Sequence, residues 1–298
     1  MDFDVIIIGG SYAGLSAGLA LGRSLRKVLI VDANKPCNAQ TPHSHNFLTH
    51  DGAAPAEIAG KARAEVLKYP TVNIVNEKVV SATKNNNGFI VQLANGKKFS
   101  ARRIILATGM KDILPSIKGF AECWAISIIH CPYCHGYEVK GEKVALFMNG
   151  EMAFEMVKMI SHWNSDLQIL TNGASDFTEE QRLKLASKSI EVIEDEISEF
   201  EHENGKLMAV LFRNGKRLEF AAVYSKPKME QHDVLFQELG CNLNENGLLE
   251  TNEQYETTSK GVYAAGDCTL PYRGLSAVAA SGTMAAVMLN RDLISEDF

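Results

Sequence analysis

The chain has 298 residues, of which 46% are hydrophobic and 22% charged, a composition typical of a soluble globular protein of about two domains. Its net charge of −6, with no basic block, argues against nucleic-acid binding and against adsorption to an anionic membrane. Six cysteines in a chain of this length do not make a disulfide scaffold.

The N-terminus runs directly into an apolar segment, residues 5–8. It lacks the positively charged start of a signal peptide, and no apolar run approaches the roughly 18 residues that cross a bilayer. We therefore expect a cytoplasmic protein without a membrane segment.

The first 32 residues follow a β-α-β pattern. Residues 5–8 predict a buried strand, residues 13–25 a helix, and residues 28–31 a second strand that ends at Asp32. A glycine-rich turn joins the first strand to the helix and consists of Gly9, Gly10, Ser11, Tyr12, Ala13 and Gly14. Ser11 replaces the middle glycine of the usual fingerprint, but the strand, the helix and the terminal acid together predict a dinucleotide site.

Short strands separated by turns are expected from residue 73 to residue 106. Residues 85–88 and 95–97 have the Asn-Gly composition of hairpin turns. The last strand of this stretch ends in Ala107, Thr108 and Gly109. Taken alone, that end is also compatible with an ordinary strand-to-loop turn.

A Cys-x-x-Cys sequence with a following histidine, Cys131-Pro132-Tyr133-Cys134-His135, lies in mid-chain. Such a spacing lowers the thiol pKa and favours rapid thiol–disulfide exchange, and the histidine can take and return the proton. We therefore predict a redox pair with Cys131, Cys134 and His135 as catalytic residues.

Two other interpretations of the pair stay open. It could supply half of a zinc site with His130 or His135, although no other cysteines are spaced as a second half, so we predict no metal. It could also be a buried, unreactive pair of thiols.

A second α/β segment is expected from residue 114 to residue 239, with a strand at 143–148, a helix at 151–162 and a strand at 166–171. Its turn has one glycine and carries Glu151, whose charge repels a pyrophosphate. The following strand ends without an acid for a ribose or arginines for a 2′-phosphate. This segment therefore predicts a nucleotide-binding fold without the chemistry of the site.

The C-terminal part returns to the first pattern. Residues 261–267 predict a short buried strand ending in Gly266 and Asp267, and residues 275–293 a long helix rich in small residues. The small residues allow close approach of a ligand or a partner helix. The whole pattern predicts an α/β protein with two Rossmann-like, three-layer domains.

These motifs, in this order, resemble the low-molecular-weight thioredoxin reductases, a family of FAD-dependent pyridine nucleotide-disulfide oxidoreductases. The resemblance covers nearly the whole chain. It implies an FAD-binding domain formed by residues 1–113 and 241–298, into which a domain like those that bind NAD(P)H, residues 114–240, is inserted. The family also implies a homodimer.

The resemblance implies a role for each matched residue. Cys134 is the thiol that meets the flavin, and Cys131 is the one that exchanges with the external substrate. The implied FAD contacts are the Gly9–Gly14 turn, Asp32, Ala33, His45, Ala107, Thr108, Gly109, Gly266, Asp267 and Leu275.

Three departures from the family pattern are informative. His135 stands where the family has an aspartate, the glycines and arginines of the nicotinamide site are missing, and Gly274 replaces a glutamine near the flavin. A histidine directly after Cys-x-x-Cys resembles the pattern of the dithiol oxidases that close disulfides in natural products. The loss of the nicotinamide motif resembles the reductases that work without NADPH, including the ferredoxin-dependent ones.

We therefore predict an FAD-dependent disulfide reductase or dithiol oxidase that works without NADPH. Its substrate is a small dithiol or disulfide or a thioredoxin-like protein, and its electron partner is oxygen or a ferredoxin-type protein. An NADPH-dependent disulfide reductase of the thioredoxin reductase type and a non-enzymatic redox sensor remain the alternatives.

Overall fold

The computed structural model describes residues 1–232 and 234–298, which form two compact units. Unit 1 contains residues 1–39, 46–111 and 229–298, and unit 2 contains residues 40–45 and 112–228. The family resemblance implied that residues 114–240 form the inserted domain. The contacts instead start this unit at residue 112, end it at residue 228 and add the short segment 40–45.

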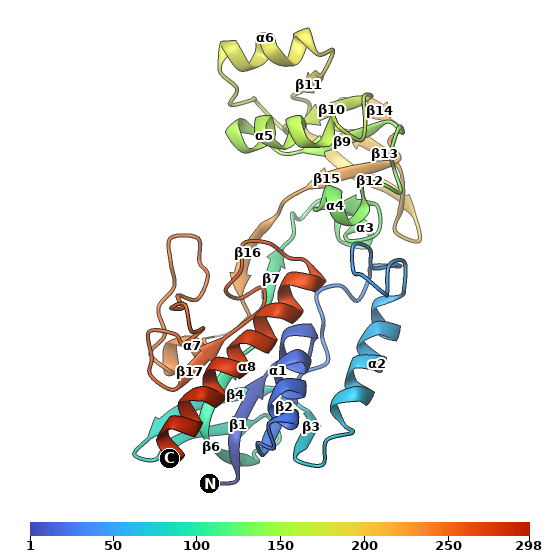
Figure 1. Ribbon diagram of the computed structural model, residues 1–298. Coiled ribbons are helices and arrows are strands. Elements are labelled where there is room, and N and C mark those ends of the chain that lie inside the picture. Colours follow the sequence, from blue (N-terminus) through green and yellow to red (C-terminus); the bar gives the residue numbers. More distant parts are fainter. Residues whose placement is uncertain (233) are drawn as a thin grey trace. The chain divides into compact units, whose positions relative to one another are not determined.

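Unit 1 is built on a seven-stranded sheet with the strand order β3-β2-β1-β6-β5-β4, and β17 pairs with β6 (Figure 1). The pairs among β1, β2, β3, β6 and β17 are parallel, whereas β4 and β5 are antiparallel to their neighbours. The strands are β1 (Phe3–Ile8), β2 (Val28–Asp32), β3 (Val72–Asn76), β4 (Val79–Asn85), β5 (Gly88–Leu93), β6 (Lys98–Leu106) and β17 (Val262–Ala264).

Among the described residues, unit 1 contains four helices, and the long α8 lies along α1 in Figure 1. They are α1 (Tyr12–Arg23), α2 (Pro55–Val66), α7 (Leu235–Glu238) and α8 (Leu275–Asp297). Two short strands, β7 (Met110–Ile113) and β16 (Lys228–Gln231), pair with each other where the chain passes from one unit to the other.

Residues 5–8 of strand β1 are buried on both faces, as their uninterrupted apolar sequence predicts. Ile6 and Ile8 belong to one hydrophobic cluster of unit 1, and Val5 and Ile7 belong to the other. The pleat sends successive side chains to opposite faces, so a sheet covered on both sides requires apolar residues at every position.

The hairpins expected at residues 85–88 and 95–97 are confirmed by the antiparallel pairs β4–β5 and β5–β6. The first helix begins at Tyr12 and ends at Arg23, not at residues 13 and 25. Leu25 adopts a left-handed conformation with φ of 61°, which a helix cannot contain. Helix α8 extends to Asp297, four residues beyond the expected end.

Unit 2 contains a five-stranded parallel sheet, β11-β10-β9-β15-β8, and a three-stranded antiparallel sheet, β12-β13-β14. The strands are β8 (Ile128–Ile129), β9 (Val144–Phe147), β10 (Leu167–Leu170), β11 (Glu191–Ile193), β12 (Ile197–Glu203), β13 (Lys206–Phe212), β14 (Arg217–Leu218) and β15 (Ala222–Ser225). The helices are α3 (Phe120–Cys123), α4 (Pro132–His135), α5 (Gly150–Ile160) and α6 (Glu179–Ser187).

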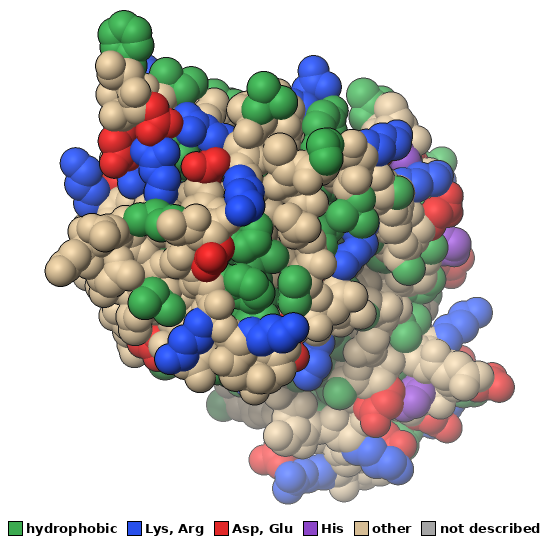
Figure 2. Space-filling model, turned by 90° about the horizontal axis from the view of Figure 1, so that it is seen from below, with side chains coloured by type: hydrophobic (Ala, Val, Ile, Leu, Met, Phe, Trp, Pro, Cys, Tyr) green, Lys and Arg blue, Asp and Glu red, His purple; other side chains and the backbone are tan. Residues whose placement is uncertain are grey.

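Charges of both signs are mixed over the surface that Figure 2 shows, with apolar side chains between them. This mixture agrees with the small net charge of the chain. In the part of the chain that the structure describes, no helix is both long enough and apolar enough to cross a bilayer.

Candidate active site

The two cysteines of the predicted redox pair lie on the short helix α4 of unit 2. Cys131 is the N-cap in an extended conformation, and Pro132 occupies the first helical turn, where its missing N–H costs no hydrogen bond. The N–H groups of Cys134 and His135 both donate to the Cys131 carbonyl, at 3.1 Å. This single turn brings the two Sγ atoms to 2.6 Å from each other, close enough for the pair to form and break a disulfide.

The thiol of Cys131 is more acidic than an ordinary cysteine thiol. A hydrogen bond from the Cys134 thiol lowers the pKa of Cys131 from 9 to about 7, with further help from the N–H groups of Cys134 and Tyr133 and against the effect of burial. A substantial fraction of Cys131 is therefore thiolate near neutral pH, which is the reactive form.

His135 follows the pair directly and is half-buried. Burial lowers the pKa of His135 below 6.5, the charge of His45 lowers it further, and Glu138 acts in the opposite direction. The imidazole is therefore neutral at pH 7 and can accept a proton.

The structure brings His45 to this helix, although it is 90 positions earlier in the chain. Its ring lies edge-on to that of His135, with 6.2 Å between the ring centres, and its Nε2 lies 3.5 Å from Oε1 of Glu138. The sequence pointed to His45 only as a flavin contact, which remains a prediction. Glu138 was missed, although a carboxylate three residues after His135 could have been noticed.

Tyr224 was missed as well, because it lies on the buried strand β15 and has no motif around it. Its side chain is fully buried, and its hydroxyl has no hydrogen-bond partner among the described residues. Burial raises the pKa of Tyr224 to about 12, and the charges of Cys131 and Glu138 add to the shift. The hydroxyl is thus close enough to the redox helix for the charges of Cys131 and Glu138 to affect its pKa.

In unit 1, the turn between β1 and α1 brings backbone segments into very close contact. A Cβ on Gly9 would lie 2.1 Å from the Ala107 carbonyl oxygen, and one on Gly14 would lie 1.9 Å from the Gly9 oxygen. Only glycine fits these positions, and Gly9 also has a φ of 107°. Ser11, the N-cap of α1, makes no side-chain cap, and the first turn has no acidic residue. This helix end suits an anion such as a pyrophosphate.

Asp32 ends β2 directly beside this turn. A Cβ on Gly10 would lie 2.7 Å from the Cβ of Asp32, and the N–H of Asn34 donates to the Asp32 carboxylate at 3.1 Å. Ala33 follows on the surface. The acid therefore stands next to the anion site, where the resemblance expects the ribose.

The C-terminal motif lies against the same helix. A Cβ on Gly266 would lie 2.9 Å from the Cβ of Ala13, and the N–H of Gly266 donates to the Ser281 hydroxyl at 3.0 Å. Asp267 is about 12% exposed and forms an ion pair with Arg273 at 3.3 Å. Leu275 begins α8 immediately afterwards.

Cys268, next to this motif, is completely buried. Burial raises its pKa to about 11, against hydrogen bonds from Gly109 and Thr108. It is therefore an inert, packed thiol. Ala107–Gly109 thus lies against Gly9 on one side and Cys268 on the other, so the Gly9–Gly14, Ala107–Gly109 and Gly266–Asp267 motifs come together and fit an FAD dinucleotide.

Helix α5 of unit 2 occupies the position in its β-α-β unit that α1 occupies in unit 1, but its N-terminus is closed by its own side chains. Asn149 Oδ1 accepts hydrogen bonds from the N–H groups of Gly150 at 2.8 Å and Asp176 at 2.9 Å. Glu151 lies in the first turn, and Gln181 donates to its carboxylate at 2.5 Å. A carboxylate and a cap therefore stand where a nucleotide phosphate would bind.

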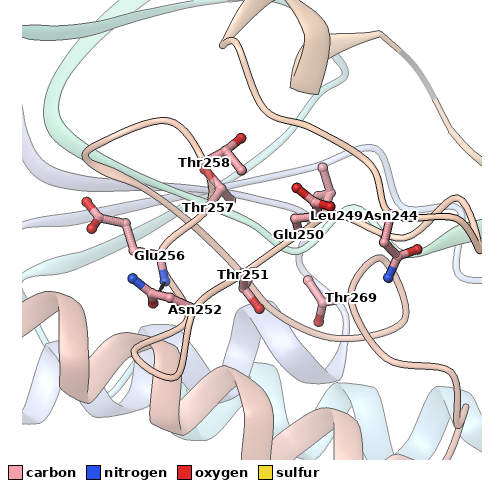
Figure 3. A pocket seen from close by; sticks show the side chains of 9 residues that line it. All are labelled: Asn244, Leu249, Glu250, Thr251, Asn252, Glu256, Thr257, Thr258 and Thr269. Atoms are coloured by element: carbon pink, nitrogen blue, oxygen red, sulfur yellow. Dashed lines mark hydrogen bonds between the residues drawn. The ribbon is translucent and has the colours of Figure 1, made fainter.

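A polar pocket of about 550 Å³ lies among the loops before and after residue 250 of unit 1 (Figure 3). Its side chains already serve those loops. Asn252 accepts from the N–H groups of Gln254 and Glu256, Thr258 accepts from Asn242, and Thr269 donates to the Gly266 carbonyl. These polar side chains are therefore accounted for by the hydrogen bonds that hold the loops, and the pocket needs no ligand to explain them.

Comparison with known proteins agrees with this geometry. Residues 3–286 match the family model described as pyridine nucleotide-disulphide oxidoreductase. The chain is 29% identical over 313 residues to thioredoxin reductase sirT of Leptosphaeria maculans, covering 99% of this chain and 95% of that protein.

Two solved structures are also similar. One is a putative thioredoxin reductase, TrxB, from Bacillus anthracis, with a TM-score of 0.95 and 34% identity over 99% of this chain and 100% of that one. The other is an oxidoreductase from Agrobacterium tumefaciens, with a TM-score of 0.92, 35% identity and 99% coverage of both chains.

The fold and the redox pair together define an enzyme of the thioredoxin reductase type, with two Rossmann-type domains. The chain belongs to the pyridine nucleotide-disulphide oxidoreductase family. Membership implies FAD as the cofactor and confirms the oxidoreductase class that the sequence predicted.

Proposed function

We propose that this protein is an FAD-dependent thiol–disulfide oxidoreductase that works without NADPH. Electrons pass between a dithiol or disulfide substrate, the Cys131–Cys134 pair and FAD. The observation that carries the proposal is the contrast between the two helix N-termini. The side chain of Ser11 does not cap the N-terminus of α1. The N-terminus of α5, by contrast, is occupied by the side chains of Asn149 and Glu151.

The thiol steps follow from the geometry of α4. In the oxidative direction, His135 accepts the proton of a substrate thiol, and the thiolate attacks the sulfur of Cys131. The disulfide between Cys131 and Cys134 breaks, and Cys134 leaves as a thiolate. The second substrate thiol then gives its proton to His135 in the same way, and its thiolate displaces Cys131, so the substrate becomes a disulfide and Cys131 and Cys134 are left as thiolates. Reduction runs these steps backwards.

The FAD site in this proposal is formed by unit 1. The Gly9–Gly14 turn and the N-terminus of α1 hold the pyrophosphate, Asp32 and Ala33 lie at the adenosine ribose, and Asp267 binds the ribityl chain. Ala107, Thr108, Gly109, Gly266 and Leu275 line the remainder, and His45 of unit 2 stays a flavin contact expected from the resemblance alone. Bound FAD supplies a two-electron acceptor in the oxidative direction and a two-electron donor in the reductive one.

The partners in this proposal are a small dithiol or disulfide, or a thioredoxin-like protein, together with oxygen or a ferredoxin-type protein as the electron partner. The protein acts as a cytoplasmic homodimer, as the family resemblance implies. A second candidate is an NADPH-dependent disulfide reductase, which the names of the similar proteins favour. Its nucleotide would have to displace Glu151 from Gln181.

The decisive experiment follows the visible absorbance of the flavin in oxidised holoprotein under anaerobic conditions. NADPH and NADH are added first, and dithiothreitol afterwards. We expect no bleaching by either nicotinamide and full bleaching by the dithiol. Bleaching by NADPH would instead identify a conventional NADPH-dependent reductase.

The Cys134→Ser variant should retain bound flavin and lose dithiol-driven bleaching. If turnover is unchanged, the thiol scheme is wrong. The His135→Ala variant should slow thiol exchange about 100-fold, at the lower end for loss of a general base, and should shift its pH profile.

A further inference from the structure

The segment 40–45 is held in unit 2, apart from the chain on either side of it. The side-chain amide of Gln40 donates to the carbonyl oxygens of Ala121 at 3.2 Å and Trp124 at 3.4 Å. Thr41 and Ser44 are buried. These anchors fix the place of His45 next to the redox helix.

Three titratable side chains then form a continuous row. The ring of His135 lies edge-on to that of His45 with 6.2 Å between the ring centres, and Nε2 of His45 lies 3.5 Å from Oε1 of Glu138. The row leads outward, because the side chain of His45 is 23% exposed and that of Glu138 is 40% exposed.

We propose that His45 and Glu138 are positioning residues that form a proton relay, taking up the proton that His135 removes from a thiol and delivering it to solvent. This inference rests on the proposed function, because it concerns the proton that leaves during dithiol oxidation.

The chemistry of the reaction requires such an exit. A dithiol that becomes a disulfide loses two electrons and two protons. The electrons go to the Cys131–Cys134 pair and from there to FAD. Both protons pass through the base; reduced FAD retains one of them near neutral pH and the other leaves, so His135 must lose each proton before it can act again.

The charges around the row favour transfer of a single proton. A positive charge on His45 disfavours a proton on His135. Glu138 stabilises one positive charge on the pair. The other titratable groups near the row are His43, whose ring lies 6.4 Å from that of His45, and Cys131, Cys134 and Tyr224 on the side of the helix.

The test uses oxidised holoprotein mixed rapidly with dithiothreitol, without oxygen, in weak buffer at pH 6–9. Flavin absorbance reports reduction, and a pH-indicator dye reports the released protons. We expect His45→Ala to slow both signals about tenfold, Glu138→Gln to slow them less, and added imidazole to restore the His45→Ala rate, because these variants remove the proton acceptors beyond His135.

His43→Ala is the matched control, since it removes a histidine from the same segment, and it should react like the wild type. The relay is overturned if His45→Ala reacts within twofold of the wild-type rate, or if it is slow with an unchanged pH profile and no response to imidazole, which indicates a purely structural role. If dithiothreitol fails to reduce the wild-type protein, the proposed function fails and the relay with it.

Discussion

The hydroxyl of Tyr224 lies directly beneath Gly136, 3.1 Å from the point where a Cβ on that glycine would stand. Gly136 follows the redox helix, and its N–H donates to the Pro132 carbonyl at 2.7 Å. The same Cβ would lie 2.5 Å from that carbonyl oxygen. A buried tyrosine of the sheet and the turn that carries Cys131 and Cys134 are therefore packed without room for a methyl group.

Replacement of this tyrosine by phenylalanine tests whether its hydroxyl is satisfied. Tyr224→Phe should raise the free energy of unfolding of the holoprotein by about 1 kcal/mol, because it removes a buried hydroxyl without a partner among the described residues. Urea denaturation measures the change. A loss of stability would show that the hydroxyl has a partner, such as a buried water molecule.

Tyr263 is the matched control. It is also fully buried, but its hydroxyl donates to the carboxylate of Asp292. Tyr263→Phe should therefore lower the free energy of unfolding by about 1–3 kcal/mol, because it leaves a carboxylate without its donor.

The pH dependence of alkylation tests the environment of Cys131. In reduced protein, its reaction with iodoacetamide should rise with pH around a midpoint near 7, because only the thiolate reacts. Cys134→Ala should move the midpoint up toward 9, since the hydrogen bond from the Cys134 thiol is the largest cause of the lowered pKa. Peptide mass spectrometry resolves the site.

Buried cysteines provide the internal reference for that measurement. Burial raises the pKa of Cys241 and Cys268, so both should stay unmodified in the folded protein at every pH tested. A wild-type Cys131 midpoint of 9 would contradict the assigned role of Cys134.

Two helical glycines should respond in opposite ways to alanine. A Cβ on Gly282 in α8 would lie 2.1 Å from the Ala13 carbonyl oxygen of α1, so Gly282→Ala should destabilise the fold by about 1–3 kcal/mol. Gly60 in α2 has nothing within 4 Å, so Gly60→Ala should stabilise it by about 1 kcal/mol through helix propensity. Equal effects in thermal unfolding would refute the close packing of α1 on α8.

Acid should weaken the attachment of the C-terminal helix. Hydrogen bonds from Arg102 and Arg26 lower the pKa of Asp297 from 3.8 to about 2. Because the folded pKa lies below the unfolded one, this contribution to stability is present above pH 4 and disappears as the pH falls toward 2. The melting temperatures of wild type and Asp297→Asn should differ at pH 6 and converge near pH 2. A constant difference would exclude the ion pairs as its cause.

The sequence alone determined the local elements and the motif-based site residues. A β-α-β unit is predicted by Val5–Ile8, the Gly9–Gly14 turn and Asp32. Each of these signals, the apolar strand, the glycine turn and the acid at the strand end, lies in a short stretch of neighbouring residues. The same holds for the hairpins at residues 85–88 and 95–97, and for the spacing of Cys131 and Cys134 on one turn of backbone.

Only the tertiary structure decided which distant residues join that chemistry. Gln40 anchors His45 beside His135, and strand β15 carries Tyr224 to the redox helix. Neither placement leaves a periodic pattern in the sequence. The place of His45 depends on which backbone carbonyls accept hydrogen bonds from the Gln40 amide, and the place of Tyr224 depends on how the sheet packs. Long-range contacts of this kind are fixed by the folded chain as a whole. The lowered pKa of His135 has the same origin, because burial and a neighbour 90 positions away produce it.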